Sequence, residues 1–208
     1  MDNLQKFYIN GHWVAPISSA IMPVLNPATE HQIGTVAMGS GADVDQAVAA
    51  AKEAFKTFSQ TSKSERLELL RRLKQVTESR FEELAQAMRM EMGAPITMAR
   101  EIQADAAVGH LQGFIDALET LEERIVLDNG DVLLREPIGV CGLITPWNWP
   151  MNQIVLKVVP ALATGSTCIL KPSEHTPISA MIYAEIIHEA GYPPGVFNLV
   201  NGHGPSVG

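Results

Sequence analysis

The chain has 208 residues, of which 46% are hydrophobic and 18% are charged, and its formal net charge is −8. This composition excludes a disordered chain, and the length suits one large domain or one and a half, enough to bury a core. The acidic balance without a basic cluster argues against nucleic acid as the main partner. No apolar stretch reaches the roughly 18 residues of a membrane helix, and the first ten residues lack a signal-peptide layout. We therefore expect a cytoplasmic protein with no membrane partner.

Residues 7–37 predict short strands. Asn10-Gly11 lies between two short apolar runs, which is typical of a hairpin turn. Asn26-Pro27 marks a second turn before a strand at 33–36. An amphipathic helix is expected next, over residues 43–58.

Two longer helical stretches follow. Ser62 and Glu65 form a capping box that opens one of them, and Gly93 ends it, with a break expected at 77–80. The other is expected over 96–121. Its predicted buried stripe consists of Ile102, Ala106, Leu111, Ile115 and Leu118.

Residues 124–136 predict a hairpin, because Asp128-Asn-Gly-Asp131 lies between two short apolar runs. Residues 137–208 differ in composition from the residues before them. They hold 9 of the 13 prolines and 8 of the 16 glycines, but only five charged residues: Lys157, Lys171, Glu174, Glu185 and Glu189. Such a segment is typical of a buried sheet with punctuated loops.

The pattern after Pro137 alternates strands and helices. A first apolar run without polar alternation suits a strand that is covered on both faces of a parallel sheet. Strand, helix, strand, helix and strand are expected in turn, at 138–144, 150–163, 167–170, 177–190 and 196–200. This order is one mononucleotide-binding half of a doubly wound sheet. The predicted fold is therefore α/β, with an incomplete, Rossmann-like parallel sheet.

Ligands of such sheets bind outside the carboxyl ends of the strands. Right-handed crossovers place the three strand exits of this segment on one edge. These exits are residues 145–150, 171–177 and 201–208, and they contain most of the segment's unusual polar residues. We expect a binding site there, although ordinary loop punctuation is the alternative.

Three polar residues in these exits are candidates for chemistry. The neutral amide of Asn148 could donate to a developing oxyanion, or it could cap the following helix. Lys171 could reach cofactor hydroxyls or phosphate, or it could be a solvated surface lysine. Glu174 could bind both hydroxyls of an adenine ribose and repel a 2′-phosphate, or it could be a first-turn carboxylate of the next helix.

Other motifs are weaker. Gly202-His-Gly-Pro-Ser-Val-Gly208 is similar to a dinucleotide fingerprint, but three residues instead of two precede its last glycine. Cys141 and Cys168 lie inside apolar strands, where a thiol is expected to be buried and inert. The six histidines show no metal-ligand spacing, so no metal is expected.

Several motifs in order resemble the NAD(P)-dependent aldehyde dehydrogenase superfamily. In the last third they are Ile144-Thr-Pro-Trp-Asn-Trp-Pro150, Pro160-Ala-Leu-Ala-Thr-Gly165, Lys171-Pro-Ser-Glu174 with Thr176-Pro177, Gly195-Val-Phe-Asn-Leu-Val200 and Gly202-x-Gly204. Upstream they are Ile9-x-Gly11-x-Trp13, Asn26-Pro27, Glu91-x-Gly93 and Arg135-Glu-Pro-x-Gly139. The resemblance covers essentially the whole chain.

The resemblance implies NAD(P)+-dependent oxidation of a small-molecule aldehyde to a carboxylic acid through a cysteine thiohemiacetal and thioester. Asn148 would donate to the oxyanion of that thiohemiacetal. A cofactor site is implied for Ile144, Thr145, Pro146 and Trp147 beside the nicotinamide, Lys171 and Glu174 at the adenosine ribose, and Gly204 and Gly208 where the backbone approaches the cofactor. Glu174 favours NAD, and NADP is the alternative.

The resemblance also implies an organisation. Residues 1–123 would be the N-terminal strands and helices of the cofactor-binding domain, and residues 124–136 part of an oligomerisation arm. Residues 137–208 would be the βαβαβ core of the NAD-binding domain. The full-length protein would form a homodimer or homotetramer.

One departure from the family is large. The family's catalytic cysteine, its glutamate base and its Gly-Ser-Thr-x-x-Gly turn are all expected beyond Gly208. We therefore expect an N-terminal portion of an aldehyde dehydrogenase that is inactive alone and associates through an exposed sheet edge. The alternative is a non-catalytic binding or scaffold protein.

Overall fold

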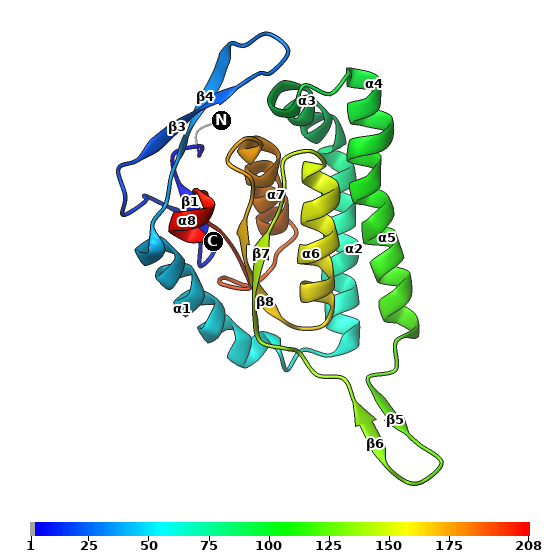
Figure 1. Cartoon of the computed structure of the whole chain (residues 1–208). Helices are drawn as coiled ribbons and strands as arrows, with labels where there is room; N and C mark the ends of the chain where they lie inside the picture. The colour runs from blue at the N-terminus through cyan, green and yellow to red at the C-terminus, as the bar shows by residue number, and fades with distance from the viewer. Residues whose placement is uncertain (1–2) are drawn as a thin grey trace.

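A computed structural model describes residues 3–208, which are built around one five-stranded sheet (Figure 1). Its strand order is β2-β1-β9-β8-β7. β7, β8 and β9 are parallel, whereas β1 is antiparallel to β9 and to β2. The strand bounds are β1 Phe7–Ile9, β2 His12–Val14, β7 Val140–Ile144, β8 Thr167–Lys171 and β9 Phe197–Leu199. The predicted α/β fold with a parallel core is confirmed, and an N-terminal hairpin extends the sheet on one side.

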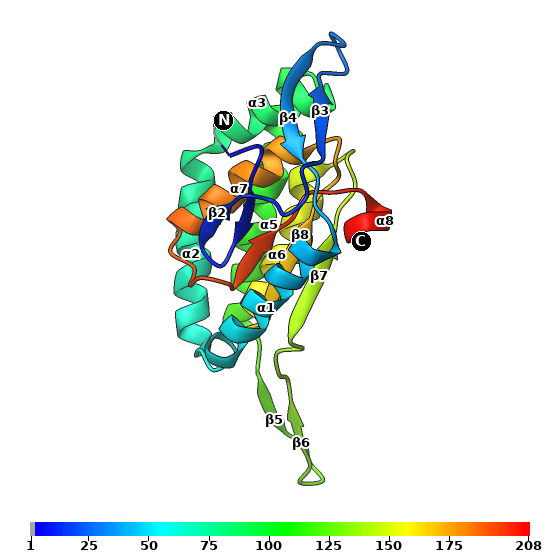
Figure 2. The same cartoon turned by 90° about the vertical axis from the view of Figure 1, so that its left-hand side faces the viewer.

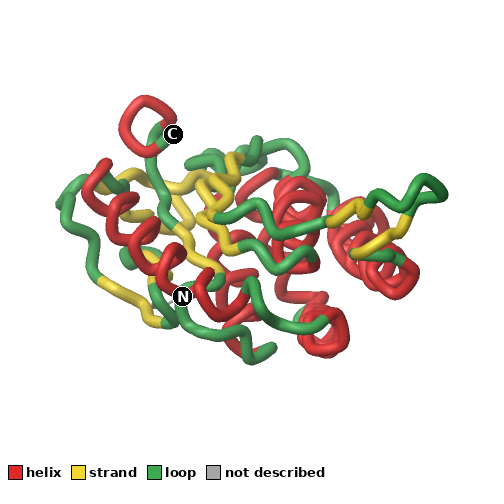
Figure 3. The backbone as a smooth tube through the Cα atoms, turned by 90° about the horizontal axis from the view of Figure 1, so that it is seen from below, coloured by secondary structure: helices red, strands yellow, loops and turns green. Residues whose placement is uncertain are grey.

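Helices cover both faces of this sheet (Figures 1 and 3). α1 (Gly41–Phe58) packs on one face, and α6 (Pro150–Ala163) and α7 (Pro177–Glu189) pack on the other. Alternate residues of β8 follow this division: Ile169 belongs to the apolar cluster on the α1 side, and Leu170 to the larger cluster on the opposite side. α2 (Lys63–Ser79), α3 (Phe81–Met92) and α5 (Asp105–Thr120) form a further layer against α6 and α7.

The ends of α2 and α3 follow from local sequence chemistry. Ser62 and Glu65 form the expected capping box, in which the Glu65 carboxylate accepts a hydrogen bond of 2.7 Å from the Ser62 amide. Arg80 interrupts the stretch between α2 and α3, as predicted. Gly93 ends α3 in the left-handed conformation, with φ of 76°.

The next helical stretch differs from its prediction. It is α4 (Ile96–Met98), the π-helical turn η1 (Ala99–Ala104) and then α5. Ile102, predicted to be buried, is 47% exposed, while Gln103 and Ala104 are fully buried. A π turn bonds i to i+5 and holds more residues than an α turn, so it rotates the side chains around the axis. A stripe drawn with a period of 3.6 residues therefore has the wrong phase in η1.

Strand β7 also differs from its prediction. A strand covered on both faces was expected, but β7 is half-buried because it forms an edge of the sheet. Ile144 is 56% exposed, and Cys141 is partly exposed instead of buried. The predicted exposed edge is thus present at β7 within residues 3–208, and the absence of a neighbour there accounts for the exposed side chains.

Two hairpins project from opposite ends of the molecule (Figure 2). β3 (Ile21–Leu25), which lies in the region 7–37 of predicted short strands but was given no bounds of its own, pairs with β4 (Gln32–Ala37). β5 (Arg124–Val126) and β6 (Val132–Leu134) form the predicted second hairpin, with Val126 paired to Val132. Its apolar side chains Val126, Leu133 and Leu134 are exposed. No helix within residues 3–208 is both long and apolar enough to cross a membrane.

Candidate functional site

The three parallel strands end at one edge of the sheet, as the topology predicted. Ile144 pairs with Lys171 in register, and the Thr145 amide donates to the Lys171 carbonyl at 3.2 Å. The Val200 amide donates to the Leu170 carbonyl at 3.0 Å. The loops after β7, β8 and β9 therefore start side by side. We call the surface that these loops form, at residues 145–150, 171–177 and 201–208, the strand-end site.

Glu174 connects two of these loops. Its carboxylate accepts from Lys171 Nζ at 3.0 Å and lies 3.2 Å from Nδ1 of His203. Partial burial would raise the pKa of Glu174, but hydrogen bonds from its own backbone amide, from Lys171 and from His203 outweigh burial and lower that pKa to about 2. Glu174 is therefore a fixed negative charge at the strand-end site at neutral pH.

The structure decides the alternatives that the sequence left open for Lys171 and Glu174. Lys171 is only 8% exposed, so it is no solvated surface lysine. Glu174 precedes α7 by three residues and lies outside its first turn. The two side chains bind each other, and neither caps α7.

The carboxylate that caps α7 comes instead from α3. Glu91 is 3% exposed and accepts hydrogen bonds from the Ile178 amide, from the Ser179 hydroxyl and, at 3.0 Å, from the Ser179 amide. Burial raises the pKa of Glu91 to about 7, and the three donors offset burial only in part. The sequence analysis named Glu91 only within the motif Glu91-x-Gly93 and did not predict its capping role. Its partners are 87 and 88 residues away along the chain, so no local pattern indicates them.

The loop after β7 presents a different set of side chains. Thr145 is buried, whereas Pro146, Trp147 and Asn148 are exposed. The N-cap residue of α6 is Trp149, and no side chain caps that helix. Within residues 3–208 the Asn148 amide has no hydrogen-bond partner in the chain. Its expected alternative role as a helix cap is therefore not what the structure shows, and the amide is free to bind something else.

The glycine-rich loop after β9 forms a short helix, α8 (Gly204–Val207). A side chain at Gly204 would meet no atom within 4 Å, so its backbone is open to a ligand. At Gly208 a Cβ would lie 2.6 Å from the Gly204 carbonyl oxygen, so close packing of the turn itself requires glycine there. The two predicted glycines thus share a loop, but glycine serves a different purpose at each: open space for a ligand at Gly204 and close packing of the turn at Gly208.

A cleft of about 800 Å³ opens beside the strand-end site. Trp147, His175 and Thr176 line it from the strand-end loops, and Glu91 and Met92 line it from α3. The β3–β4 hairpin contributes Met22 to Leu25 and supplies the remaining wall with Asn26, Pro27 and Glu30. His175, Thr176 and His203 were not predicted as site residues. Their position in the strand exits is the one sequence signal that could have indicated them.

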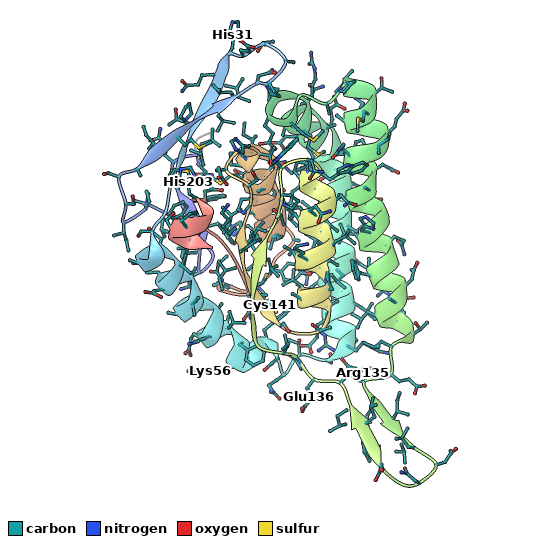
Figure 4. The ribbon with its side chains drawn as sticks, viewed as in Figure 1. His31, Lys56, Arg135, Glu136, Cys141 and His203 are labelled. Carbon is teal, nitrogen blue, oxygen red and sulfur yellow. The ribbon has the colours of Figure 1, made fainter. Side chains whose placement is uncertain are left out.

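The two thiols lie away from this site. Cys141 and Cys168 are register partners on β7 and β8, and burial, with a smaller contribution from Cys141, raises the pKa of Cys168 far above its ordinary value. Figure 4 shows Cys141 near the start of β7 and His203 beside α8. Among the described residues, no group of His, Cys, Asp or Glu side chains could hold a metal ion.

Comparisons with known proteins agree on one family. A sequence model described as the aldehyde dehydrogenase family matches residues 13–208. A 3-succinoylsemialdehyde-pyridine dehydrogenase from Pseudomonas sp is 50% identical over all of this chain and 44% of its own length. This chain thus spans less than half the length of the curated relatives that it matches.

Solved structures show the same likeness. A mutant of aldehyde dehydrogenase C from Pseudomonas syringae, crystallised with NAD+ and octanal, is 52% identical with a TM-score of 0.97 over 99% of this chain and 42% of that one. An aldehyde dehydrogenase from Bartonella henselae is 46% identical with a TM-score of 0.96 over 98% of this chain and 43% of that one. A betaine aldehyde dehydrogenase mutant from Staphylococcus aureus in complex with NAD+ is 30% identical, with a TM-score of 0.93 over 98% and 43% of the two chains.

Proposed function

The chain belongs to the aldehyde dehydrogenase family, and from that premise we propose that the whole protein oxidises an aldehyde to a carboxylic acid with NAD+. The observation that carries this proposal is the strand-end site, where the loop after β8, which holds the Lys171–Glu174 pair, adjoins the loop after β7, which holds Asn148. Related proteins of known structure were crystallised with NAD+, and one of them with octanal as well.

The strand-end site fits a dinucleotide. Glu174 is ionised and partly exposed, so its remaining lone pairs can accept from the two hydroxyls of a ribose. Lys171 supplies donors at the same point, and the open backbone at Gly204 permits close approach. Ile144, Thr145, Pro146 and Trp147 would flank the nicotinamide, and Gly208 would maintain the turn. When bound, NAD+ supplies the hydride acceptor of the oxidation.

Asn148 would serve the reacting aldehyde. Its exposed amide has no other partner within residues 3–208, and an amide stays neutral at every working pH. A neutral donor aimed at the oxyanion of a cysteine adduct stabilises the transition state by roughly 3–4 kcal/mol in a site without water. The cysteine of that adduct is neither Cys141 nor Cys168, because Cys168 is buried with a raised pKa and both lie at the opposite end of their strands. The chain alone is accordingly proposed to be inactive.

The β5–β6 hairpin fits an oligomerisation arm. It projects from the body of the molecule (Figure 1). Its side chains Val126, Leu133 and Leu134 are exposed. Apolar side chains on a projecting hairpin are typical of surfaces that a partner covers. We propose that residues 124–136 form this arm in a homodimer or homotetramer. In the proposed organisation, residues 1–123 are the N-terminal strands and helices of the cofactor-binding domain, and residues 137–208 are its βαβαβ core.

The test is an assay of the full-length protein. We expect NADH to form when NAD+ is supplied with members of a panel of aldehydes that includes octanal and an aromatic semialdehyde. Gln60→Ala, which removes an exposed amide remote from the strand ends, should leave the rate unchanged. Absence of NADH with every aldehyde of the panel would contradict the proposed function.

A further inference from the structure

His203 makes the contact that joins Glu174 to another loop. Lys171 and Glu174 are three residues apart, so their ion pair lies within one loop. His203 follows β9, 29 residues further along the chain, and its Nδ1 lies 3.2 Å from Oε1 of Glu174. Figure 4 shows His203 where the chain enters α8. Within residues 3–208, this is the only side-chain hydrogen bond between Glu174 and a residue outside its own loop.

The direction of the His203 hydrogen bond follows from chemistry. The pKa of Glu174 is lowered to about 2, so its carboxylate is ionised and can only accept. Nδ1 of His203 must therefore carry the hydrogen. It carries one in the charged imidazolium and also in one of the two neutral tautomers, so the contact does not depend on the charge of the ring.

Two donors on opposite oxygens restrict how the carboxylate can turn. Lys171 binds Oε2 and His203 binds Oε1, so a rotation of Glu174 must break at least one hydrogen bond to a charged group. An ionised carboxylate offers about four lone-pair sites, and those that Lys171, His203 and the backbone amide of Glu174 do not occupy remain for a ligand. These sites have a fixed direction only while both donors are in place.

We propose that His203 is a positioning residue for the cofactor: by holding Glu174 across two loops, it sets the preference for a dinucleotide with a free 2′-hydroxyl over one with a 2′-phosphate. The inference rests on the proposed function, because it presumes that the strand-end site binds a dinucleotide. A fixed carboxylate accepts from the ribose hydroxyls and repels a 2′-phosphate. A glutamate that can swing aside repels that phosphate less.

Calorimetric titration of the full-length protein with NAD+ and with NADP+ tests the proposal without turnover. His203→Leu should shift the ratio of the two dissociation constants toward NADP+ by about tenfold, since one hydrogen bond to a charged group is lost. His203→Asn should restore most of the wild-type ratio, because the asparagine Nδ2 takes the place of Nδ1 and still donates. His31→Leu, at the exposed tip of the β3–β4 hairpin (Figure 4), should not change the ratio.

The outcomes separate the two proposals. A wild-type protein that binds neither dinucleotide would overturn both the proposed function and this inference. NAD+ binding with an unchanged ratio in folded His203→Leu would overturn the positioning role alone, and so would His203→Asn behaving like His203→Leu. A melting curve for each variant verifies folding, and if the leucine variant fails to fold, a wild-type ratio in His203→Ala overturns the role.

Discussion

Two glutamates lie close to the start of α7 in opposite environments. Glu91 is buried beneath the helix, and burial raises its pKa to about 7 although three groups donate to it. Glu174 lies on the strand-end site, and its donors lower its pKa to about 2 against the effect of partial burial. Two side chains of the same type therefore differ in charge state: the surroundings of Glu91 favour the protonated form, and the surroundings of Glu174 favour the ionised form.

The different environments of Glu91 and Glu174 indicate different roles, one in stability and the other in ligand binding. Both oxygens of Glu91 accept from the first turn of α7, so this buried residue anchors the start of that helix. Glu174 and Asn148 keep free lone pairs or donors and stay partly exposed. Changes at the strand-end site should therefore affect binding and turnover, and changes at the buried anchor should affect stability.

The largest expected effect is at Asn148. Asn148→Ala should lower turnover of the full-length protein roughly 100- to 1000-fold, because one oxyanion donor is removed. The free energy of unfolding should not change, since the amide has no partner within residues 3–208. Steady-state kinetics and a denaturation curve measure the two quantities, and Gln60→Ala is the matched control. A stable variant with unchanged turnover would remove the oxyanion role.

Asn148 also shows how far sequence reasoning extends. Its place after a strand and before a helix could be predicted, because prolines and an apolar run mark both boundaries. The capping box at Ser62, the turn at Gly93 and the three strand ends were confirmed for the same reason: local chemistry determines them.

Contacts between distant segments could not be predicted. Glu91 reaches residues more than 80 positions away, His203 reaches Glu174 from another loop, and no local pattern indicates either pair. The buried stripe was drawn with a constant period of 3.6 residues, which does not hold in the π turn η1. Ile102 was therefore wrongly assigned to the buried stripe. The exposed face of β7 depends on which strands neighbour it, and a strand's own residues do not specify its neighbours.

The second prediction concerns the pH dependence of stability at Glu91. Its folded pKa of about 7 exceeds the ordinary value of 4.5, so between these pH values the folded protein keeps a proton that the unfolded chain has lost. The stability contributed by Glu91 is present below pH 4.5 and is lost as the pH rises through 7. The loss is roughly 3 kcal/mol from the size of the shift.

Glu91→Gln should remove this slope. Denaturant unfolding at several pH values compares the variant with the wild type, and the difference in free energy should change between pH 4.5 and 7. Glu68→Gln, at an exposed carboxylate on α2, should show no such change. A constant difference across that range would contradict the buried, protonated state of Glu91.

Glu174 should show the opposite sign and a smaller effect. Its folded pKa of about 2 is below the ordinary 4.5, so the stability that it contributes is present above pH 4.5 and is lost as the pH falls through 2. Because the carboxylate is partly exposed and screened, we expect a loss of about 1 kcal/mol. Melting temperatures of the wild type and Glu174→Gln should converge as the pH is lowered through this range. A gap that widens toward low pH would reverse the comparison of the two glutamates.

The smallest effect is expected at Thr176, which lies two residues after Glu174 and two residues before Ile178, a donor to Glu91. Its hydroxyl is buried without a hydrogen-bond partner among the described residues, and it does not cap α7 although the residue stands at the N-cap position. Thr176→Val keeps the shape and removes the desolvated hydroxyl, so the free energy of unfolding should stay equal or rise by less than about 1 kcal/mol. Thr167→Val is the matched contrast, because its buried hydroxyl donates to the Ala51 carbonyl at 2.9 Å. That variant should lose about 1 kcal/mol. If Thr176→Val is destabilised as much as Thr167→Val in the same denaturant series, the hydroxyl caps the helix, and Glu91 is not its sole anchor.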